Sequence, residues 1–233
     1  EQVDGCEANG VEILCCPEGV LGGLADFVSR PTEIAIGVES GQLHELLSPL
    51  VSDRVTTILG FTEIDRGGRL YNSAAVFHRG AVAGIYRKLH PAIHRSVYTA
   101  GDKAPVFTAG GLTFGIIICR DSNFPEPARS MAAQGAAALF VPSNNGLPPA
   151  KGGPELIDQA RNADIVRATE NGVFVIRADV AGRAGSLVSH GSSGIVDPDG
   201  RVLQAARQLG PDLLVADIEV VPRERRREEK GVR

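Results

Sequence analysis

The chain has 233 residues, 43% of them hydrophobic and 22% charged, with a formal net charge of −4. This composition fits one globular domain over residues 1–233 with a sizeable core, and its acidic balance argues against a nucleic-acid partner. No apolar stretch is long enough to span a bilayer, so we expect no membrane partner and predict a cytoplasmic protein. The basic residues near the C-terminus alternate with glutamates, so 223–233 is predicted to be a charged, solvated segment.

Short apolar runs, separated by turns and three helix-like stretches, organise the chain. Residues 3–10 resemble the end of a helix that leads into a strand, and an α/β domain seldom starts inside a helix, so we expect the natural polypeptide to begin further upstream. The predicted strands are, in order, Glu12–Cys16, Thr56–Phe61, Ser73–His78, Ala81–Tyr86, Thr113–Ile118, Ala138–Val141, Val173–Ala178, Ser193–Val196 and Leu213–Ile218. The predicted helices are Gly41–Val51, Glu126–Gln134 and Pro154–Asn171.

The order of these elements indicates an α/β fold. Strand–helix–strand units occur together with hairpin turns at 78–80 and 197–200, which is typical of a mixed sheet with helices packed on it. Several strands are apolar at nearly every position, which predicts burial on both faces. Two sheets packed together, each with an outer helical layer, would bury both faces of these strands. The Pro- and Gly-rich stretch 146–153 is one long loop, which is either functional or a plain surface excursion.

The four cysteines are Cys6, Cys15, Cys16 and Cys119, and none forms a Cys-x-x-Cys pair. This usage is typical of a reducing compartment and not of a disulfide framework. Cys15 and Cys16 are adjacent in a strand-like run, so their side chains should point to opposite faces.

Cys119 has the position of a nucleophile. It follows the apolar run 112–118 and precedes Pro125 and Glu126, which are typical of a helix's first turn. A thiol between a strand end and a helix N-terminus lies where backbone N–H groups and the helix dipole favour the thiolate. The alternative is a buried structural cysteine, because free cysteine is often buried.

Glu18 and Lys88 also follow apolar runs, at the sheet edge where α/β proteins bind ligands. Together with Cys119 they form a coherent chemical set: the carboxylate can take the thiol proton, and the ammonium can stabilise the thiolate and an oxyanion. Backbone N–H groups beginning at Arg120 would add donors. Taken singly, Glu18 could be a surface acid and Lys88 a solvated charge.

These segments resemble the nitrilase superfamily of carbon–nitrogen hydrolases over nearly the whole chain. Cys15-Cys16-Pro17-Glu18 is similar to the segment with the general base, Tyr86-Arg87-Lys88-Leu89-His90 to the lysine segment, and Cys119-Arg120-Asp121-Ser122-Asn123-Phe124-Pro125-Glu126 to the nucleophile segment. Two further segments resemble the family's Arg-Ala-x-Glu-Asn helix and Gly-x-Ser strand entry: Arg167-Ala168-Thr169-Glu170-Asn171 and His190-Gly191-Ser192-Ser193-Gly194.

The resemblance implies a four-layer α-β-β-α sandwich of two mixed sheets, here without the first strand and part of the first helix. It implies a homodimer or higher homo-oligomer and hydrolysis of non-peptide C–N bonds without metal or cofactor. Cys119 would attack a small amide or N-carbamoyl substrate, Glu18 would move protons and Lys88 would hold the oxyanion. The acyl-thioester would then be cleaved by water, with release of ammonia or an amine.

The main departure from the family pattern is His94, which takes the position of a second glutamate when the sequence is aligned on Tyr98 and Gly101. A different substrate or an impaired activity would explain it, and the intact motifs favour the first. We expect His94 within reach of the pocket. By the same resemblance, Arg120 favours amide or carbamoyl substrates over nitriles. Asn144 and Asn145, after the strand 138–141, are expected to line the pocket, although an ordinary turn is the simpler explanation.

Other classes remain open. A Cys–His hydrolase could use His90, His94 or His190, and a non-catalytic scaffold could keep the same fold. A metal site is the weakest interpretation, because His90 and His94 are separated by Pro91 and no further ligand cluster has suitable spacing. Candidate substrates are short aliphatic amides, ω-amides of dicarboxylic acids and N-carbamoyl amines. Arg120 or Arg177 could bind a substrate carboxylate, but an ordinary surface or ion-pair role is favoured for each.

Overall fold

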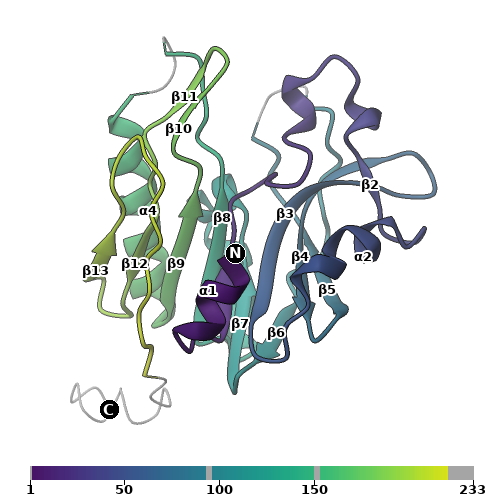
Figure 1. Ribbon diagram of the computed structural model, residues 1–233. Coiled ribbons are helices and arrows are strands. Elements are labelled where there is room, and N and C mark those ends of the chain that lie inside the picture. The colour runs from purple at the N-terminus through teal and green to yellow at the C-terminus, as the bar shows by residue number, and fades with distance from the viewer. Residues whose placement is uncertain (1, 93–95, 150–152, 220–233) are drawn as a thin grey trace.

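Two β-sheets pack face to face, with helices on their outer faces, in a computed structural model that describes residues 2–92, 96–149 and 153–219 (Figure 1). The first sheet has the order β1-β3-β4-β5, and the short β2 pairs with β3 as well. Its strands are β1 (Ile13–Cys15), β2 (Ile36–Gly37), β3 (Thr56–Ile64), β4 (Leu70–His78) and β5 (Ala81–Arg87). β1 and β2 run parallel to β3, whereas β3, β4 and β5 form an antiparallel meander.

The second sheet has the order β13-β12-β9-β8-β7-β6. Its strands are β6 (Val106–Ala109), β7 (Leu112–Ile116), β8 (Ala138–Ser143), β9 (Phe174–Asp179), β12 (Gly194–Val196) and β13 (Val202–Ala205). The central strands β7, β8 and β9 are parallel, and antiparallel strands flank them on both sides. A separate hairpin consists of β10 (Gly182–Ala184) and β11 (Leu187–Ser189).

The core between the sheets joins residues of both. Ile58 and Tyr86 of the first sheet belong to the same buried cluster as Phe114 and Phe140 of the second. This explains why so many strands are apolar at nearly every position. Of the two adjacent cysteines, Cys15 packs against this inner cluster and Cys16 against the outer cluster of the first sheet, so the predicted opposite orientations are confirmed.

Helices complete the four layers on the two outer faces. Leu43 and Leu47 of α2 (Gln42–Leu47) are fully buried against β3 and β4. On the other side, α3 (Pro125–Ala133) packs on β7, and α4 (Glu155–Asn171) packs on β9 and β12 (Figure 1). The short α1 (Gln2–Ala8) buries Val3 and Cys6 near the start of β1. Within the described residues, 3₁₀ turns are formed by Ala25–Phe27, Pro31–Glu33, Ser48–Leu50 and Cys119–Asn123. The predicted α-β-β-α sandwich is therefore confirmed.

Two predicted elements need correction. The predicted strand Leu213–Ile218 is wrong, because no strand is formed at 211–219 and the side chains of Leu213 and Val215 are about half exposed. Apolar alternation alone does not make a strand, and within the described residues this segment has no ladder partner. The predicted helix 41–51 ends as an α-helix at Leu47, followed by the 3₁₀ turn that contains Pro49. Sequence patterns also missed the short strands β2, β6, β10, β11 and β13.

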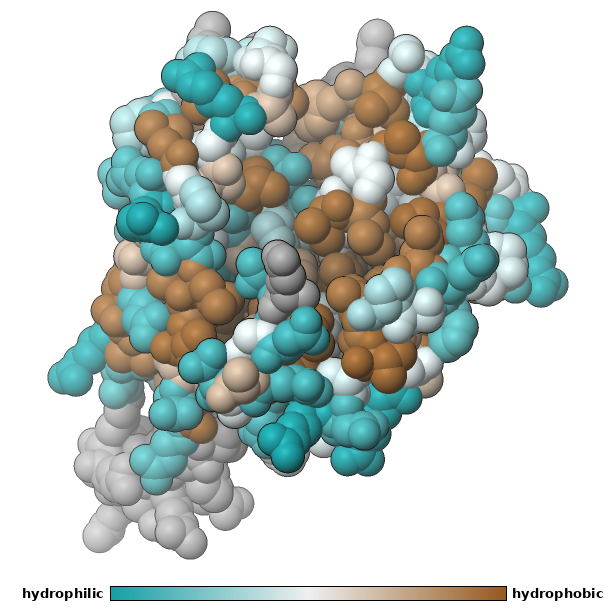
Figure 2. Space-filling view, viewed as in Figure 1, coloured by the Kyte–Doolittle hydropathy of each residue, from teal (hydrophilic) through white to brown (hydrophobic). Residues whose placement is uncertain are grey.

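Apolar side chains are exposed at the β13 edge of the second sheet, among them Val202 and Leu203. Figure 2 shows hydrophobic residues gathered over this edge, on the left of the view. The predicted homo-oligomer stays a prediction. None of the helices in the described ranges combines the length and the apolar character needed to cross a membrane. The predicted charged segment 223–233 lies outside the described residues.

Candidate active site

Glu18 follows β1 and enters the space above the neighbouring strand β3. Gly60 of β3 makes this possible, since a Cβ atom there would lie 2.7 Å from the Glu18 Cα atom and 2.5 Å from the Gly19 nitrogen. The Glu18 backbone N–H donates to the Ser143 carbonyl at the end of β8. The segment is therefore fixed to both sheets, and its carboxylate is buried.

Lys88 follows β5 and meets Glu18 directly. The Lys88 Nζ atom lies 2.6 Å from Glu18 Oε1, and both side chains are 3% exposed. Asn72 Nδ2 of β4 also donates to Oε1, at 2.7 Å, and the Asn144 backbone N–H donates to Oε2 at 3.0 Å. Three donors from three elements hold the carboxylate, so its position is defined by the tertiary structure.

The carboxylate of Glu18 stabilises the positive charge of Lys88. Burial by itself would lower the pKa of Lys88, but the negative charge of Glu18 raises the pKa above its ordinary value. Lys88 is therefore an ammonium at neutral pH. Only one of its three N–H groups is directed to Glu18 within the described part of the chain, which leaves donors for another oxygen.

Cys119 begins the 3₁₀ turn 119–123, separated by two residues from the end of the second sheet's strand β7 at Ile116. Its φ angle is +45°, which is rare for a residue with a side chain and stores of the order of 1–3 kcal/mol of strain. As the first residues of a helical turn, Cys119 and Arg120 have N–H groups that no carbonyl of that turn can accept. A strained turn that combines a nucleophile with free N–H donors is a known feature of hydrolase active sites.

Asp121 holds this turn in place. Its buried carboxylate accepts from the Tyr86 hydroxyl at 2.7 Å and from the Ile118 backbone N–H at 3.1 Å. The other oxygen accepts from the His90 backbone N–H and lies 3.0 Å from His90 Nδ1. The His90 ring stacks on Phe124, with the centroids 3.8 Å apart. The sequence motif contained Asp121, but no role for it was predicted.

The Cys119 thiol is held as a thiol. Its sulfur lies 3.8 Å from Asn145 Oδ1. Burial and the charge of Glu18 raise its pKa to about 11, and the cations Lys88 and Arg177 counteract this only in part. Burial and the carboxylates therefore act against the thiolate, in the direction opposite to that expected from the turn's N–H groups and the helix dipole. The thiol needs a base.

The remaining predicted residues have different environments. Asn144 and Asn145 contact Glu18 and Cys119, and a role in lining a substrate pocket stays a prediction. Arg120 is exposed, and its guanidinium lies 5.8 Å from the Phe124 ring centroid. Arg177 is buried in an ion pair with Asp164, with 2.5 Å between Nη2 and Oδ1, which agrees with the ion-pair interpretation. His94 lies outside the described residues.

Sequence reasoning missed the polar residues that support the site. Asn72 is an interior strand residue, and Asp179 ends β9. The sequence around Asn72 and Asp179 does not distinguish them from other residues, because polar residues within strands are common. Among the described residues no histidine hydrogen-bonds the Cys119 sulfur, and no three His, Cys, Asp or Glu side chains are grouped as a metal site.

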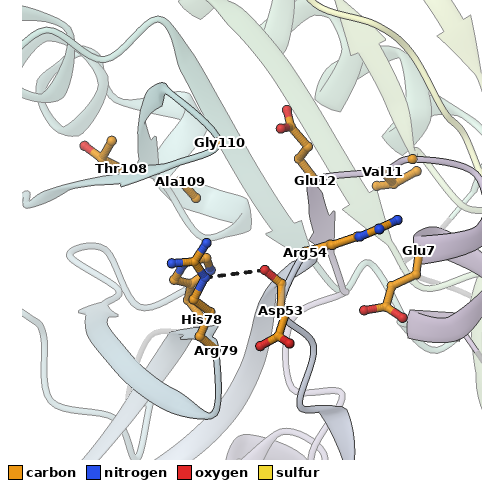
Figure 3. A pocket seen from close by; sticks show the side chains of 11 residues that line it. Glu7, Val11, Glu12, Asp53, Arg54, His78, Arg79, Thr108, Ala109 and Gly110 are labelled. Carbon is orange, nitrogen blue, oxygen red and sulfur yellow. Dashed lines mark hydrogen bonds between the residues drawn. The ribbon is translucent and has the colours of Figure 1, made fainter.

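A separate hollow of about 550 Å³ lies at the opposite end of the strands (Figure 3). It is lined by Glu12 before β1 and Gly110 before β7, whereas Glu18 and Cys119 follow these strands. Figure 3 shows charged side chains of both signs around it, among them Arg54, Arg79 and Glu7. No candidate catalytic residue lines this hollow, so its size does not mark it as the active site.

A buried Glu–Lys pair and a cysteine on a strained turn, all at one edge of an α-β-β-α sandwich, define a cysteine hydrolase of non-peptide C–N bonds as the class to test. The model of the carbon-nitrogen hydrolase family matches residues 3–227, and the chain belongs to this family.

Relatives agree with this assignment. An (R)-stereoselective amidase from a Pseudomonas species is 31% identical over 223 residues, which are 94% of this chain and 78% of that protein. A nitrilase from Pyrococcus abyssi is 32% identical over 81% of this chain and 69% of its own length. Among solved structures, a mutant of the amidase from Nesterenkonia sp. AN1 has a TM-score of 0.75 at 25% identity and covers 98% of this chain and 88% of that one. That structure shows the result of Michael addition of acrylamide at its active-site cysteine.

Proposed function

We propose that the protein hydrolyses the C–N bond of a small amide or N-carbamoyl compound through a thioester on Cys119. The observation that carries this proposal is the buried Glu18–Lys88 pair at the same sheet edge as the half-buried Cys119. The amidase among the relatives and the active-site cysteine of the structural neighbour support it.

In the first half-reaction, Glu18 takes the thiol proton and the sulfur attacks the substrate carbonyl carbon. The electron pair of the C=O bond moves to oxygen, and the free N–H groups of Lys88 and of the 119–120 backbone stabilise this oxyanion. Glu18 then gives the proton to the leaving nitrogen, the C–N bond breaks, and the thioester remains. A thiol with a pKa of about 11 requires such a base at neutral pH.

In the second half-reaction, Glu18 takes a proton from water, and the hydroxide attacks the thioester carbon. The C–S bond breaks, the acid leaves, and Glu18 returns its proton to the sulfur. Lys88 keeps its charge throughout, because the neighbouring carboxylate raises its pKa.

The test is an ammonia-release assay with short aliphatic amides, ω-amides of dicarboxylic acids, N-carbamoyl amines and nitriles. We expect turnover in one of the first three groups and its loss in Cys119→Ala and Glu18→Gln. Cys6→Ala is the matched control, because Cys6 lies in α1, in a buried cluster that contains neither Glu18 nor Cys119. Rapid quenching and intact-mass measurement should detect an acyl group on the wild-type protein.

Two results would contradict the proposal. A Glu18→Gln variant with full turnover, combined with an inactive His90→Ala variant, would favour a Cys–His hydrolase. No turnover in any group would favour a non-catalytic scaffold.

A further inference from the structure

Asp179, at the end of β9, has a buried carboxylate that is surrounded by donors. Oδ1 accepts from the Asn145 backbone N–H at 3.1 Å. Oδ2 accepts from Asn145 Nδ2 at 2.9 Å, from the Ser192 backbone N–H at 2.9 Å and from Ser192 Oγ at 2.7 Å. A carboxylate can only accept, so it determines which way each of these partners points.

The consequence for Asn145 is a fixed side-chain amide. Its Nδ2 group donates both to Asp179 and to Ser192 Oγ, the latter at 3.2 Å. An amide with both N–H bonds engaged on one side must direct its oxygen to the other side. That oxygen, Oδ1, faces the Cys119 sulfur at 3.8 Å.

We propose that Asp179 and Ser192 are positioning residues that hold the Asn145 amide with its oxygen toward Cys119. This oxygen then accepts a hydrogen bond from the S–H group. The contact orients the thiol before the substrate arrives and, because lone pairs face the sulfur, it disfavours a premature thiolate. When the thiol proton moves to Glu18, the same oxygen becomes free to accept an N–H of the substrate. This role rests on the function proposed above.

The surroundings of the thiol support a role for this network in keeping it neutral. The charges that act on Cys119 are Glu18 and Asp179, which raise its pKa, and Lys88 and Arg177, which lower it. Removing the Asp179 charge should therefore increase the thiolate fraction. If Asp179 also positions Asn145, the same change should decrease turnover, because the amide is then free to rotate.

These opposite signs separate positioning from a merely structural role. Asp179→Asn should increase the alkylation rate of Cys119 by iodoacetamide at pH 7, about tenfold for each unit by which the thiol pKa falls. It should decrease kcat for the best amide of the panel about tenfold, the equivalent of one lost hydrogen bond. Peptide mass spectrometry follows Cys119, with Cys6 as internal reference. Asp197→Asn, in the β12–β13 turn, is the matched control and should change neither rate.

A double-mutant cycle tests the path through Asn145. Asn145→Ala should also decrease kcat about tenfold and increase alkylation. The double variant with Asp179→Asn should lose no more kcat than either single variant, because both remove the same oriented oxygen. Losses that multiply to about a hundredfold, or alkylation that slows together with turnover, would overturn the proposal.

Two further outcomes are informative. If a thermal melt indicates that Asp179→Asn does not fold, Ser192→Ala replaces it. It should decrease kcat by a smaller factor, because the Asn145 amide loses one of its two acceptors, and it should increase alkylation less, because the Asp179 charge remains. If the wild type hydrolyses nothing in the panel, the proposed function fails. The alkylation rate of Asn145→Ala still tests the contact between the Asn145 oxygen and the thiol, since it needs no substrate, and an unchanged rate would overturn the proposal.

Discussion

Gly60→Ala tests whether the position of Glu18 depends on the close approach of two backbone segments. The added Cβ would lie 2.5 Å from the Gly19 nitrogen and 2.7 Å from the Glu18 Cα atom and the Pro17 oxygen, whereas real Cβ atoms stay beyond 3.0 Å. All three atoms belong to backbone, so no side chain can rotate away. The segment with Glu18 must shift by about 0.5 Å at least, since 3.0 Å less 2.5 Å is 0.5 Å.

Such a shift changes all three hydrogen bonds of the carboxylate, to Lys88, Asn72 and the Asn144 backbone. A misplacement of about 1 Å can cost about a hundredfold in rate, so we expect kcat to fall roughly ten- to a hundredfold. Overpacking should also decrease the free energy of unfolding by about 1–3 kcal/mol.

The assay is kcat with the best amide of the panel, together with urea unfolding. Gly5→Ala is the control, because no atom lies within 4 Å of its Cβ position in α1. It should leave kcat unchanged and stabilise the helix slightly. Wild-type kcat in Gly60→Ala would refute the reasoning that this contact determines where Glu18 lies.

Four further predictions concern buried charges and the thiol. Lys88→Met should decrease the free energy of unfolding by about 3–5 kcal/mol in urea unfolding, because Glu18 is left buried and unpaired, and adding Glu18→Gln should recover part of it. The pKa of Lys88 is higher in the folded protein than its ordinary value of 10.5. The Glu18–Lys88 pair should therefore contribute fully to the free energy of unfolding below pH 10.5, and this contribution should be lost as the pH rises through the pKa of the folded protein. Its loss already at pH 9 would contradict this reasoning. Alkylation of Cys119 should accelerate about tenfold per pH unit from pH 7 toward its pKa of about 11, and a plateau near neutral pH would be inconsistent with a raised thiol pKa. Arg177→Met should cost about 3–5 kcal/mol by leaving Asp164 unpaired, and the double variant with Asp164→Leu should be clearly more stable than Arg177→Met alone.

Local pattern was sufficient for the main elements of the fold. Strands such as β3, β4 and β8 are buried at almost every position, so their apolar runs are visible in the sequence. The three candidate catalytic residues were found because each follows such a run. The same reasoning failed at Leu213–Ile218, where a strand-like pattern has no neighbour to pair with in the described part of the chain.

The protonation state of the site was not accessible from local pattern. The position of Cys119 next to a helical turn predicted a favoured thiolate, and the structure instead raises the pKa of the thiol. The difference comes from burial and from Glu18, which is about a hundred residues away in the chain. Electrostatic effects of this kind depend on distance in space and on exclusion of water.

By itself, the sequence determined which residue types stand at the strand ends and in which order, because hydrophobic periodicity and turn chemistry act between near neighbours. Only the tertiary structure decided which partners these residues have. The Glu18 carboxylate meets the Asn144 backbone 126 positions further along the chain, and the Asn145 amide meets Ser192 47 positions further along. These hydrogen bonds form because the ends of strands from both sheets, and the start of the antiparallel β12, meet at one edge of the sandwich, and no short stretch of sequence contains both partners.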